Sequence, residues 1–320
     1  MQLRIAPVVL IGMISASPLR LDGQNRPSGP APGQLVDIGG RMMHLQCAGP
    51  RDSSPTIVFL PGAGEFSSTW SLVQQLLSNE RTCAYDPPGS GWSDASSVPR
   101  SLHQEAFDLS RLLQRANVRT PLVLVGHSIG GVVARIYAAQ FQHVAAMILV
   151  DALHEDSTQF STAVNRWVRV RELSTGHNVP EPAVGTAAPA NPPDTFLSDE
   201  LQHLHDARSR RTATLGDLPL FVIVAGKREQ PPGTTDSFWT ELRAERDAQG
   251  ADLARLSSKG VLIRAEHSGH NVQTDEPDVV ARAVRMALDA VRGRGPAPRL
   301  VLTGRESDSV ARRTNGRHSG

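Results

Sequence analysis

The chain has 320 residues, which is enough for one large α/β domain or two ordinary ones and for a sizeable hydrophobic core. Hydrophobic residues make up 39% of it and charged residues 20%, a balance that argues against a disordered or collagen-like chain. The formal net charge of +1 predicts no nucleic acid or other polyanion as a partner.

The first 17 residues resemble a secretory signal peptide. Arg4 precedes an apolar run at 5–14, and three small residues follow that run. Because the run is too short to cross a bilayer, we expect no membrane span here. The segment predicts an exported protein, periplasmic or secreted. An apolar leader on a cytoplasmic protein is the alternative.

Short apolar runs between turn residues predict β-strands along most of the chain. These runs lie at 35–38, 42–47, 56–60, 82–85, 122–125, 147–150, 220–224 and 261–263. Segments with helical spacing of apolar residues lie at 70–77, 102–116, 129–141, 239–256 and 279–291. Two glycines between the first two runs favour a β-hairpin. The later alternation of strands and helices predicts an α/β fold with a mostly parallel sheet and helices on both faces.

An insertion at 153–216 interrupts this alternation. It is too long for one crossover, and a proline-rich stretch separates two helical candidates at 163–172 and 198–211. Long insertions in compact domains usually form lids or binding elements, so we predict a cap. The predicted organisation is a signal peptide at 1–17, an α/β core at 33–152 and 217–293, the cap at 153–216 and a flexible basic tail at 294–320.

The sequence G-H-S-I-G-G at 126–131 carries the clearest functional signal. It follows the strand predicted at 122–125 directly and opens the next helix. A G-x-S-x-G match in this context is typical of a sharp strand-to-helix turn, from which the serine projects its hydroxyl at the edge of a sheet. The glycines remove Cβ atoms that would clash in such a turn. The pattern predicts Ser128 as a nucleophile, beside a helix N-terminus that favours developing negative charge.

Three further motifs accompany this turn: L-P-G-A-G at 60–64, Y-D-P-P-G-S-G-W-S-D at 85–94 and S-G-H at 268–270. With all four motifs in order, the chain resembles the α/β-hydrolase superfamily, in particular its Ser-nucleophile branch of esterases, peptidases and relatives of the cofactor-free haloperoxidases. The resemblance implies that fold, a small-molecule substrate, and serine chemistry without a cofactor or metal. Epoxide hydrolases and haloalkane dehalogenases are disfavoured, because both place a carboxylate where Ser128 stands.

The resemblance also implies the partners of Ser128. His270, in a Gly-flanked loop after the last strand, matches the family's base, and imidazole titrates in the range that activating a hydroxyl requires. The acid comes between nucleophile and base in the chain. Asp151, at the end of a predicted strand, and Glu229, in a G-x-x-E sequence after the next strand, both fit that position. Asp151 is favoured, and Glu229 remains the alternative acid.

The family's oxyanion hole is built from two backbone amides, which match Ile129 and Ala63 in this chain. Relatives commonly have His before the glycine of this loop, where this chain has Pro61. A plain strand-ending turn is therefore the alternative interpretation of the loop that contains Ala63.

Cys47 and Cys83 are the two cysteines of the chain. The strand order of the family places their strands side by side. That arrangement allows a disulfide in an exported protein, and two buried free thiols fit it equally well.

The activity implied by this resemblance is hydrolysis of an ester, thioester or amide of a small or medium substrate through an acyl-enzyme. Relatives use the same triad to cleave carbon–carbon bonds or to carry out perhydrolysis. A non-catalytic ligand-binding protein is a further alternative, because fold alone does not determine function.

Overall fold

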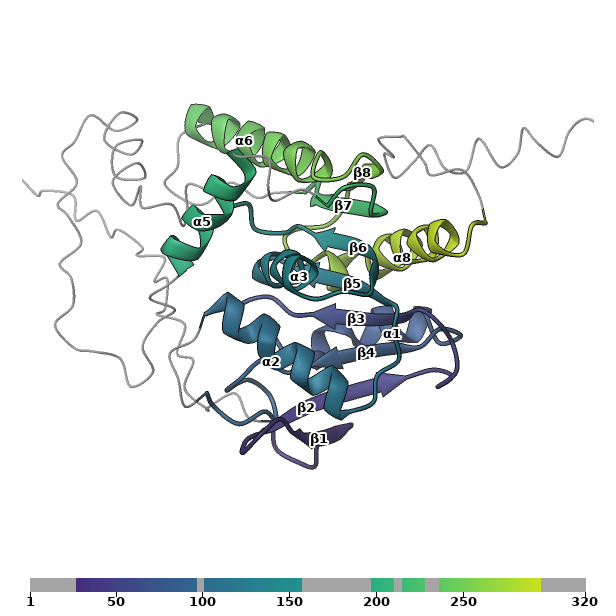
Figure 1. Ribbon diagram of the computed structural model, residues 1–320. Coiled ribbons are helices and arrows are strands. Elements are labelled where there is room, and N and C mark those ends of the chain that lie inside the picture. Colours follow the sequence, from purple (N-terminus) through teal and green to yellow (C-terminus); the bar gives the residue numbers. More distant parts are fainter. Residues whose placement is uncertain (1–26, 97–100, 157–196, 210–214, 228–235, 295–320) are drawn as a thin grey trace, which may run out of the picture.

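The computed structural model describes residues 27–96, 101–156, 197–209, 215–227 and 236–294. These residues form an eight-stranded sheet in the order β1-β2-β4-β3-β5-β6-β7-β8 (Figure 1). The strands are β1 (Gln34–Asp37), β2 (Met42–Ala48), β3 (Thr56–Leu60), β4 (Thr82–Tyr85), β5 (Leu122–His127), β6 (Val144–Val150), β7 (Leu220–Ala225) and β8 (Gly260–Ala265). Strand β2 pairs antiparallel with β1 and β4, and the other neighbours pair parallel. The predicted mostly parallel sheet is confirmed.

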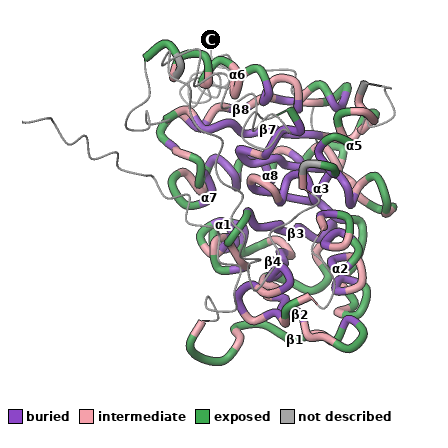
Figure 2. The backbone as a smooth tube through the Cα atoms, turned by 90° about the vertical axis from the view of Figure 1, so that its left-hand side faces the viewer, coloured by how far each residue is buried: buried purple, intermediate pink, exposed green. Residues whose placement is uncertain are grey.

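Helices cover both faces of this sheet, as predicted. They are the 3-10 segment η2 (Ser67–Trp70) and the α-helices α1 (Ser71–Leu76), α2 (Leu102–Arg115), α3 (Ile129–Gln140), α5 (Leu197–Ser209), α6 (Asp236–Ala254), α7 (Val272–Asp275) and α8 (Pro277–Val291). Helices α2, α3 and α6 pack on one face, and α1 and α8 pack on the other (Figures 1 and 2).

Alternate residues of the central strands pack into two separate cores. In β3, Val58 and Leu60 join the core beneath α2 and α3, whereas Ile57 and Phe59 join the core beneath α1 and α8. Every residue of β3 is buried, as the purple tube through the centre of Figure 2 shows. Burial of such a side chain stabilises the fold by about 1.5–3 kcal/mol. Burial on both faces explains why these strands are continuous apolar runs in the sequence.

The helix predicted at 70–77 is present as α1, and a 3-10 segment that the sequence did not predict precedes it. The 3-10 segment η2 ends at Trp70, and α1 begins at the next residue. The hydroxyl of Thr69 donates a hydrogen bond of 2.5 Å to the carbonyl of Phe66. The backbone N–H of Thr69 donates to the same carbonyl at 3.0 Å, which is the short-range bonding of a 3-10 turn.

Helix α5 is the longest described part of the predicted cap, and charged groups bind it near both of its ends. Near its start, the Glu200 carboxylate accepts hydrogen bonds from the backbone N–H groups of Leu102 at 2.9 Å and His103 at 3.0 Å. These two N–H groups begin α2 and have no carbonyl partner within that helix. Near the end of α5, Arg208 binds Glu155 at 2.6 Å. Glu200 therefore attaches the start of α5 to the core directly, and Arg208 attaches its end to Glu155, which follows β6.

Glu155 connects α5 with α3 and α6. Arg135 of α3 binds it through both terminal guanidinium nitrogens, at 2.7 and 3.1 Å. Arg208 also binds Asp252 of α6. Burial alone would raise the pKa of Glu155, but the Arg135 charge and hydrogen bonds, with the charges of His154 and Arg208, hold that pKa well below its ordinary value. Glu155 is therefore a carboxylate that stays ionised inside the protein.

Other parts of the predicted organisation lie outside the described residues. These are the signal peptide at 1–17, the first cap helix at 163–172 and the basic tail beyond 294. The domain boundaries drawn from the sequence therefore remain predictions.

The two cysteines form a disulfide. Cys47 of β2 and Cys83 of β4 are directly opposite each other in the antiparallel pair, and their sulfur atoms are 2.08 Å apart. The expected neighbouring strands are present, and the alternative of two free thiols is wrong.

Candidate active site

Ser128 occupies the sharp turn between β5 and α3. Its backbone has φ 52° and ψ −122°, a conformation that is rare for a residue with a side chain. A Cβ at Gly126 would lie 2.5 Å from the carbonyl oxygen of Gly130, and one at Gly130 would lie 2.5 Å from that of Leu60. Side chains at these two positions would collide with backbone, so the turn depends on both glycines. The steric crowding that the G-x-S-x-G spacing predicts around the turn is therefore present in the structure.

His270 and Asp151 form a hydrogen-bonded pair. Nδ1 of His270 lies 2.7 Å from Oδ2 of Asp151, and Oδ1 of the same carboxylate accepts a bond of 3.0 Å from the N–H of Ala225. Because an ionised carboxylate only accepts, this bond places a proton on Nδ1 of His270 and leaves Nε2 as the ring nitrogen that does not contact Asp151. The Asp151 side chain is buried, whereas that of His270 is 49% exposed. The other candidate acid, Glu229, lies outside the described residues.

The parallel strands bring Ser128 and this pair to the same edge of the sheet. The N–H of Ser128 donates to the carbonyl of Val150 at 3.1 Å, and Asp151 comes directly after Val150. The carbonyl of Ser128 accepts from Leu153 at 3.0 Å. Within the described residues, the Ser128 hydroxyl is not hydrogen-bonded to the His270 ring. Hydrogen bonds between a nucleophile and its base often tighten only in the substrate complex.

The two proposed oxyanion donors, Ala63 and Ile129, belong to segments that pack against each other. Ile129 is the first residue of α3, where a backbone N–H has no carbonyl partner within its own helix. The loop after β3 contacts this helix start closely, since a Cβ at Gly130 would also lie 2.5 Å from the carbonyl of Pro61. The N–H of Gly62 is bound to the carboxylate of Glu65 at 2.7 Å. The N–H of Gly62 therefore already has a hydrogen-bond partner, whereas the next residue, Ala63, is exposed.

Glu65 and Gln273 were not selected from the sequence, although they contact the segments that carry the predicted site. Oε2 of Glu65 lies 2.9 Å from Nδ1 of His127, and Nε2 of Gln273 donates to Oε1 of Glu65 at 3.1 Å. An acidic residue directly after the L-P-G-A-G motif was the signal that could have indicated Glu65. No comparable local signal marks Gln273.

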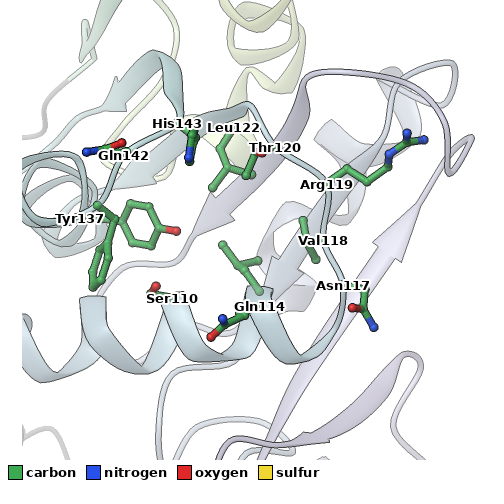
Figure 3. A pocket seen from close by; sticks show the side chains of 12 residues that line it. Ser110, Gln114, Asn117, Val118, Arg119, Thr120, Leu122, Tyr137, Gln142 and His143 are labelled. Carbon is green, nitrogen blue, oxygen red and sulfur yellow. The ribbon is translucent and has the colours of Figure 1, made fainter.

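A hollow of about 800 Å³ lies at the other edge of the sheet (Figure 3). Ser110 and Gln114 of α2 face it, as do Tyr137 of α3 and His143. Leu122, which begins β5, is part of its wall, whereas Ser128 follows the end of that strand. This hollow is therefore separate from the candidate active site and does not supply its substrate pocket.

The part of the chain that the structure describes has neither a metal-binding cluster nor a membrane-spanning helix. Its His, Cys, Asp and Glu side chains form no group of three or more that could hold a metal ion. Its helices include none with the length and apolar character needed to cross a membrane.

Comparison with known proteins identifies the family. The model of the alpha/beta hydrolase family matches residues 57–283. The chain belongs to this family. This alpha/beta hydrolase is 30% identical over 236 residues to the uncharacterized protein YqjL of Bacillus subtilis, covering 72% of this chain and 83% of that protein. It is 25% identical over 301 residues to an AB hydrolase superfamily protein of Gibberella zeae, covering 79% of this chain and 92% of that protein.

Solved structures of other alpha/beta hydrolases have the same fold. A thermophilic esterase from Thermogutta terrifontis matches with a TM-score of 0.55 and 18% identity, covering 80% of this chain and 97% of that one. The enol-lactonase from Burkholderia xenovorans LB400 has the same TM-score and identity, and the match covers 80% of this chain and 99% of that one. A haloalkane dehalogenase variant from Bradyrhizobium elkanii matches with a TM-score of 0.54 and 17% identity, covering 81% of this chain and 97% of that one. At these identities the likeness shows the fold alone.

Proposed function

We propose that this alpha/beta hydrolase is a serine hydrolase that cleaves an ester, thioester or amide of a small or medium substrate through an acyl-enzyme. One observation carries the proposal: Ser128 is held on a strained turn at the edge of the sheet where Asp151 orients the His270 ring. An esterase and an enol-lactonase are among the solved structures with this fold, so the fold is compatible with ester chemistry.

The proposed reaction begins with proton transfer from Ser128 to Nε2 of His270. Asp151 stabilises the imidazolium that forms and keeps the ring in the required tautomer. The Ser128 oxygen attacks the substrate carbonyl, and the N–H groups of Ala63 and Ile129 bind the oxyanion. One such donor typically contributes about 2.7–4 kcal/mol to transition-state stabilisation.

The second half of the reaction uses the same groups. His270 returns its proton to the leaving group, which departs and leaves an acyl group on Ser128. A water molecule then loses a proton to His270 and attacks the acyl carbon. The product acid leaves, and the proton on His270 returns to Ser128.

Fluorophosphonate labelling followed by a panel of p-nitrophenyl esters of increasing acyl length tests the proposal. We expect the wild-type protein to be labelled on Ser128, to hydrolyse short or medium esters, and to lose both properties in Ser128→Ala. Ser68→Ala is the matched control, since Ser68 is an exposed serine in η2. Labelling that persists in Ser128→Ala would remove this residue from the mechanism.

We also propose that the protein is exported. The leader-like sequence at 1–17 and the Cys47–Cys83 disulfide support this location, because disulfides persist mainly in oxidising compartments. N-terminal sequencing of the protein from the periplasm or medium tests it. An intact N-terminus on protein found in the cytoplasm would contradict it.

A further inference from the structure

Beneath the candidate active site, side chains from three separate segments meet around the carboxylate of Glu65. Glu65 belongs to the loop after β3, His127 ends β5, and Gln273 lies in α7. Nδ1 of His127 lies 2.9 Å from Oε2 of Glu65, and Nε2 of Gln273 lies 3.1 Å from Oε1. His127 and Gln273 are fully buried, and the Glu65 side chain is 14% exposed. The cluster is therefore internal, and substrate does not need to touch it.

The remaining bonds of this cluster reach the backbone of the proposed catalytic segments. Nε2 of His127 lies 2.9 Å from the carbonyl oxygen of His270. Oε2 of Glu65 accepts a bond of 2.7 Å from the N–H of Gly62, the residue before Ala63. The Glu65 carboxylate is thus bonded directly to the loop after β3 that contains Ala63, called here the oxyanion loop. Through His127 it is also connected to the loop that carries His270.

His127 has hydrogen-bond partners at both of its ring nitrogens. Its Nε2 lies 2.9 Å from the carbonyl oxygen of His270, and its Nδ1 lies 2.9 Å from Oε2 of Glu65 and 3.2 Å from Nε2 of Gln273. Both ring nitrogens of His127 are therefore engaged, and the ring is held between Glu65 and the backbone of His270. Burial alone would raise the pKa of Glu65, but the hydrogen bond and charge of His127, with the Gly62 N–H, lower that pKa below its ordinary value.

Close packing supports this arrangement. A Cβ at Gly62 would lie 2.8 Å from Nδ1 of His127, so the oxyanion loop lies directly on that ring. The rings of His127 and His270 are in contact, with their centroids 4.6 Å apart. Movement of Glu65 or His127 would therefore be transmitted to both proposed catalytic segments.

We propose that Glu65 is a positioning residue, whose carboxylate holds the oxyanion loop, the Ser128 turn and the His270 loop in register. It acts through Gly62, His127 and Gln273 and touches neither the substrate nor the reacting atoms. This inference rests on the proposed serine hydrolase function. Misplacing a catalytic group by about 1 Å can lower the rate about 10²-fold, so such a residue has a large effect on turnover.

The test compares Glu65→Ala and Glu65→Gln with wild-type protein. The measurements are the rate of fluorophosphonate labelling of Ser128, kcat and KM for the best p-nitrophenyl ester, and the melting temperature. We expect Glu65→Ala to lower kcat and the labelling rate by about 10- to 100-fold with KM changed less than about twofold. Glu65→Gln retains an oxygen acceptor for Gly62 and recovers part of the loss.

Two further variants separate positioning from general stability. Glu80→Gln is the matched control, because Glu80 is a half-buried glutamate paired with Arg292 away from the site, and we expect it to leave kcat unchanged. Gln273→Met removes the bond to Glu65 with little change in side-chain size, and we expect a smaller loss of kcat. Combined with Glu65→Ala it lowers kcat no further, because both substitutions break the same network.

The outcomes distinguish this inference from the proposed function. If wild-type Ser128 is not labelled, the serine hydrolase proposal itself fails. If it is labelled, but Glu65→Ala keeps the wild-type kcat and labelling rate, the positioning role of Glu65 is overturned alone. Losses that are additive between Glu65 and Gln273 also overturn it. Should Glu65→Ala not fold, Glu65→Gln and Gln273→Met provide the same comparison.

Discussion

The carboxylate of Asp151 lies 2.7 Å from Nδ1 of His270, although 119 positions separate the two residues in the chain. The bond determines which imidazole nitrogen can accept the Ser128 proton. We expect Asp151→Asn to lower kcat by about 10⁴-fold, because an amide at this position favours the wrong tautomer. Steady-state kinetics with the best p-nitrophenyl ester measure the effect, and Asp278→Asn, at an exposed carboxylate of α8, is the control.

The same measurements on Glu229→Gln test the alternative acid. If Asp151→Asn retains near-normal turnover while Glu229→Gln loses it, the acid role belongs to Glu229. A loss confined to Asp151→Asn supports the proposed assignment.

Gly130→Ala tests the packing of the Ser128 turn against the oxyanion loop. The new Cβ would lie 2.5 Å from two backbone carbonyl oxygens, those of Leu60 and Pro61, and neither can rotate away as a flexible side chain could. We expect about 1–3 kcal/mol lower unfolding free energy from overpacking. Labelling of Ser128 should also slow by about 10²-fold because the two segments are pushed apart.

Ala139→Gly, at an exposed position of the same helix, provides the comparison for Gly130→Ala. It should cost about 0.5–1 kcal/mol of stability through helix propensity and leave labelling unchanged. Wild-type labelling in Gly130→Ala would contradict the close packing of the turn and the loop.

Removal of the disulfide should lower stability substantially. Cys47 and Cys83 are 36 positions apart, and the cross-link restricts the unfolded chain accordingly. We expect Cys47→Ala/Cys83→Ala to lose about 3–4 kcal/mol of unfolding free energy. Urea denaturation with and without a thiol reductant measures this. Equal stability of the wild-type protein with and without reductant would contradict the prediction.

Glu155→Gln tests the ionic connection between α5 and the core. Removing one partner from a buried charge cluster typically costs about 3–5 kcal/mol, because Arg135 and Arg208 remain without their carboxylate. The folded-state pKa of Glu155 is lowered, so its contribution to stability is present above its ordinary value of 4.5 and declines as the pH falls below it. The difference between wild type and variant should therefore be largest at neutral pH and narrow in acid.

Urea denaturation at pH 7, 5 and 4 measures this dependence on Glu155. Asp217→Asn, which alters an exposed pair with Lys259, should change the unfolding free energy by less than about 0.5 kcal/mol. A constant difference between wild type and Glu155→Gln at all three pH values would contradict the assigned ionisation.

Much of the fold could be predicted because its determinants are local. Strands β3 and β4 are buried on both faces and are short, mostly apolar runs, so their bounds in the structure are those that the sequence predicts. The turn at Ser128 could also be predicted, since its steric demands fall on glycines one or two positions away. Features of this kind are visible in a short stretch of sequence.

The triad acid, the Glu65 cluster and the disulfide could not be assigned from the sequence, because they depend on contacts between distant parts of the chain. Asp151 and Glu229 both follow predicted strands, and only the tertiary structure shows a carboxylate, that of Asp151, on His270. The bond between Glu65 and Gln273 spans 208 positions, and neither residue is part of a periodic pattern. The disulfide followed from the register of β2 against β4, which strand order alone does not give.

The bond between Cys47 and Cys83 also makes a closed covalent ring of the intervening chain. This ring includes β3 and the loop after it, which contains Ala63 and Glu65. Ser128 lies outside that ring, so the predicted site is built from one cyclised and one linear portion of the polypeptide. A protease that cuts once between the two cysteines cannot detach the cyclised portion. The nicked protein remains a single molecule until the sulfurs are separated.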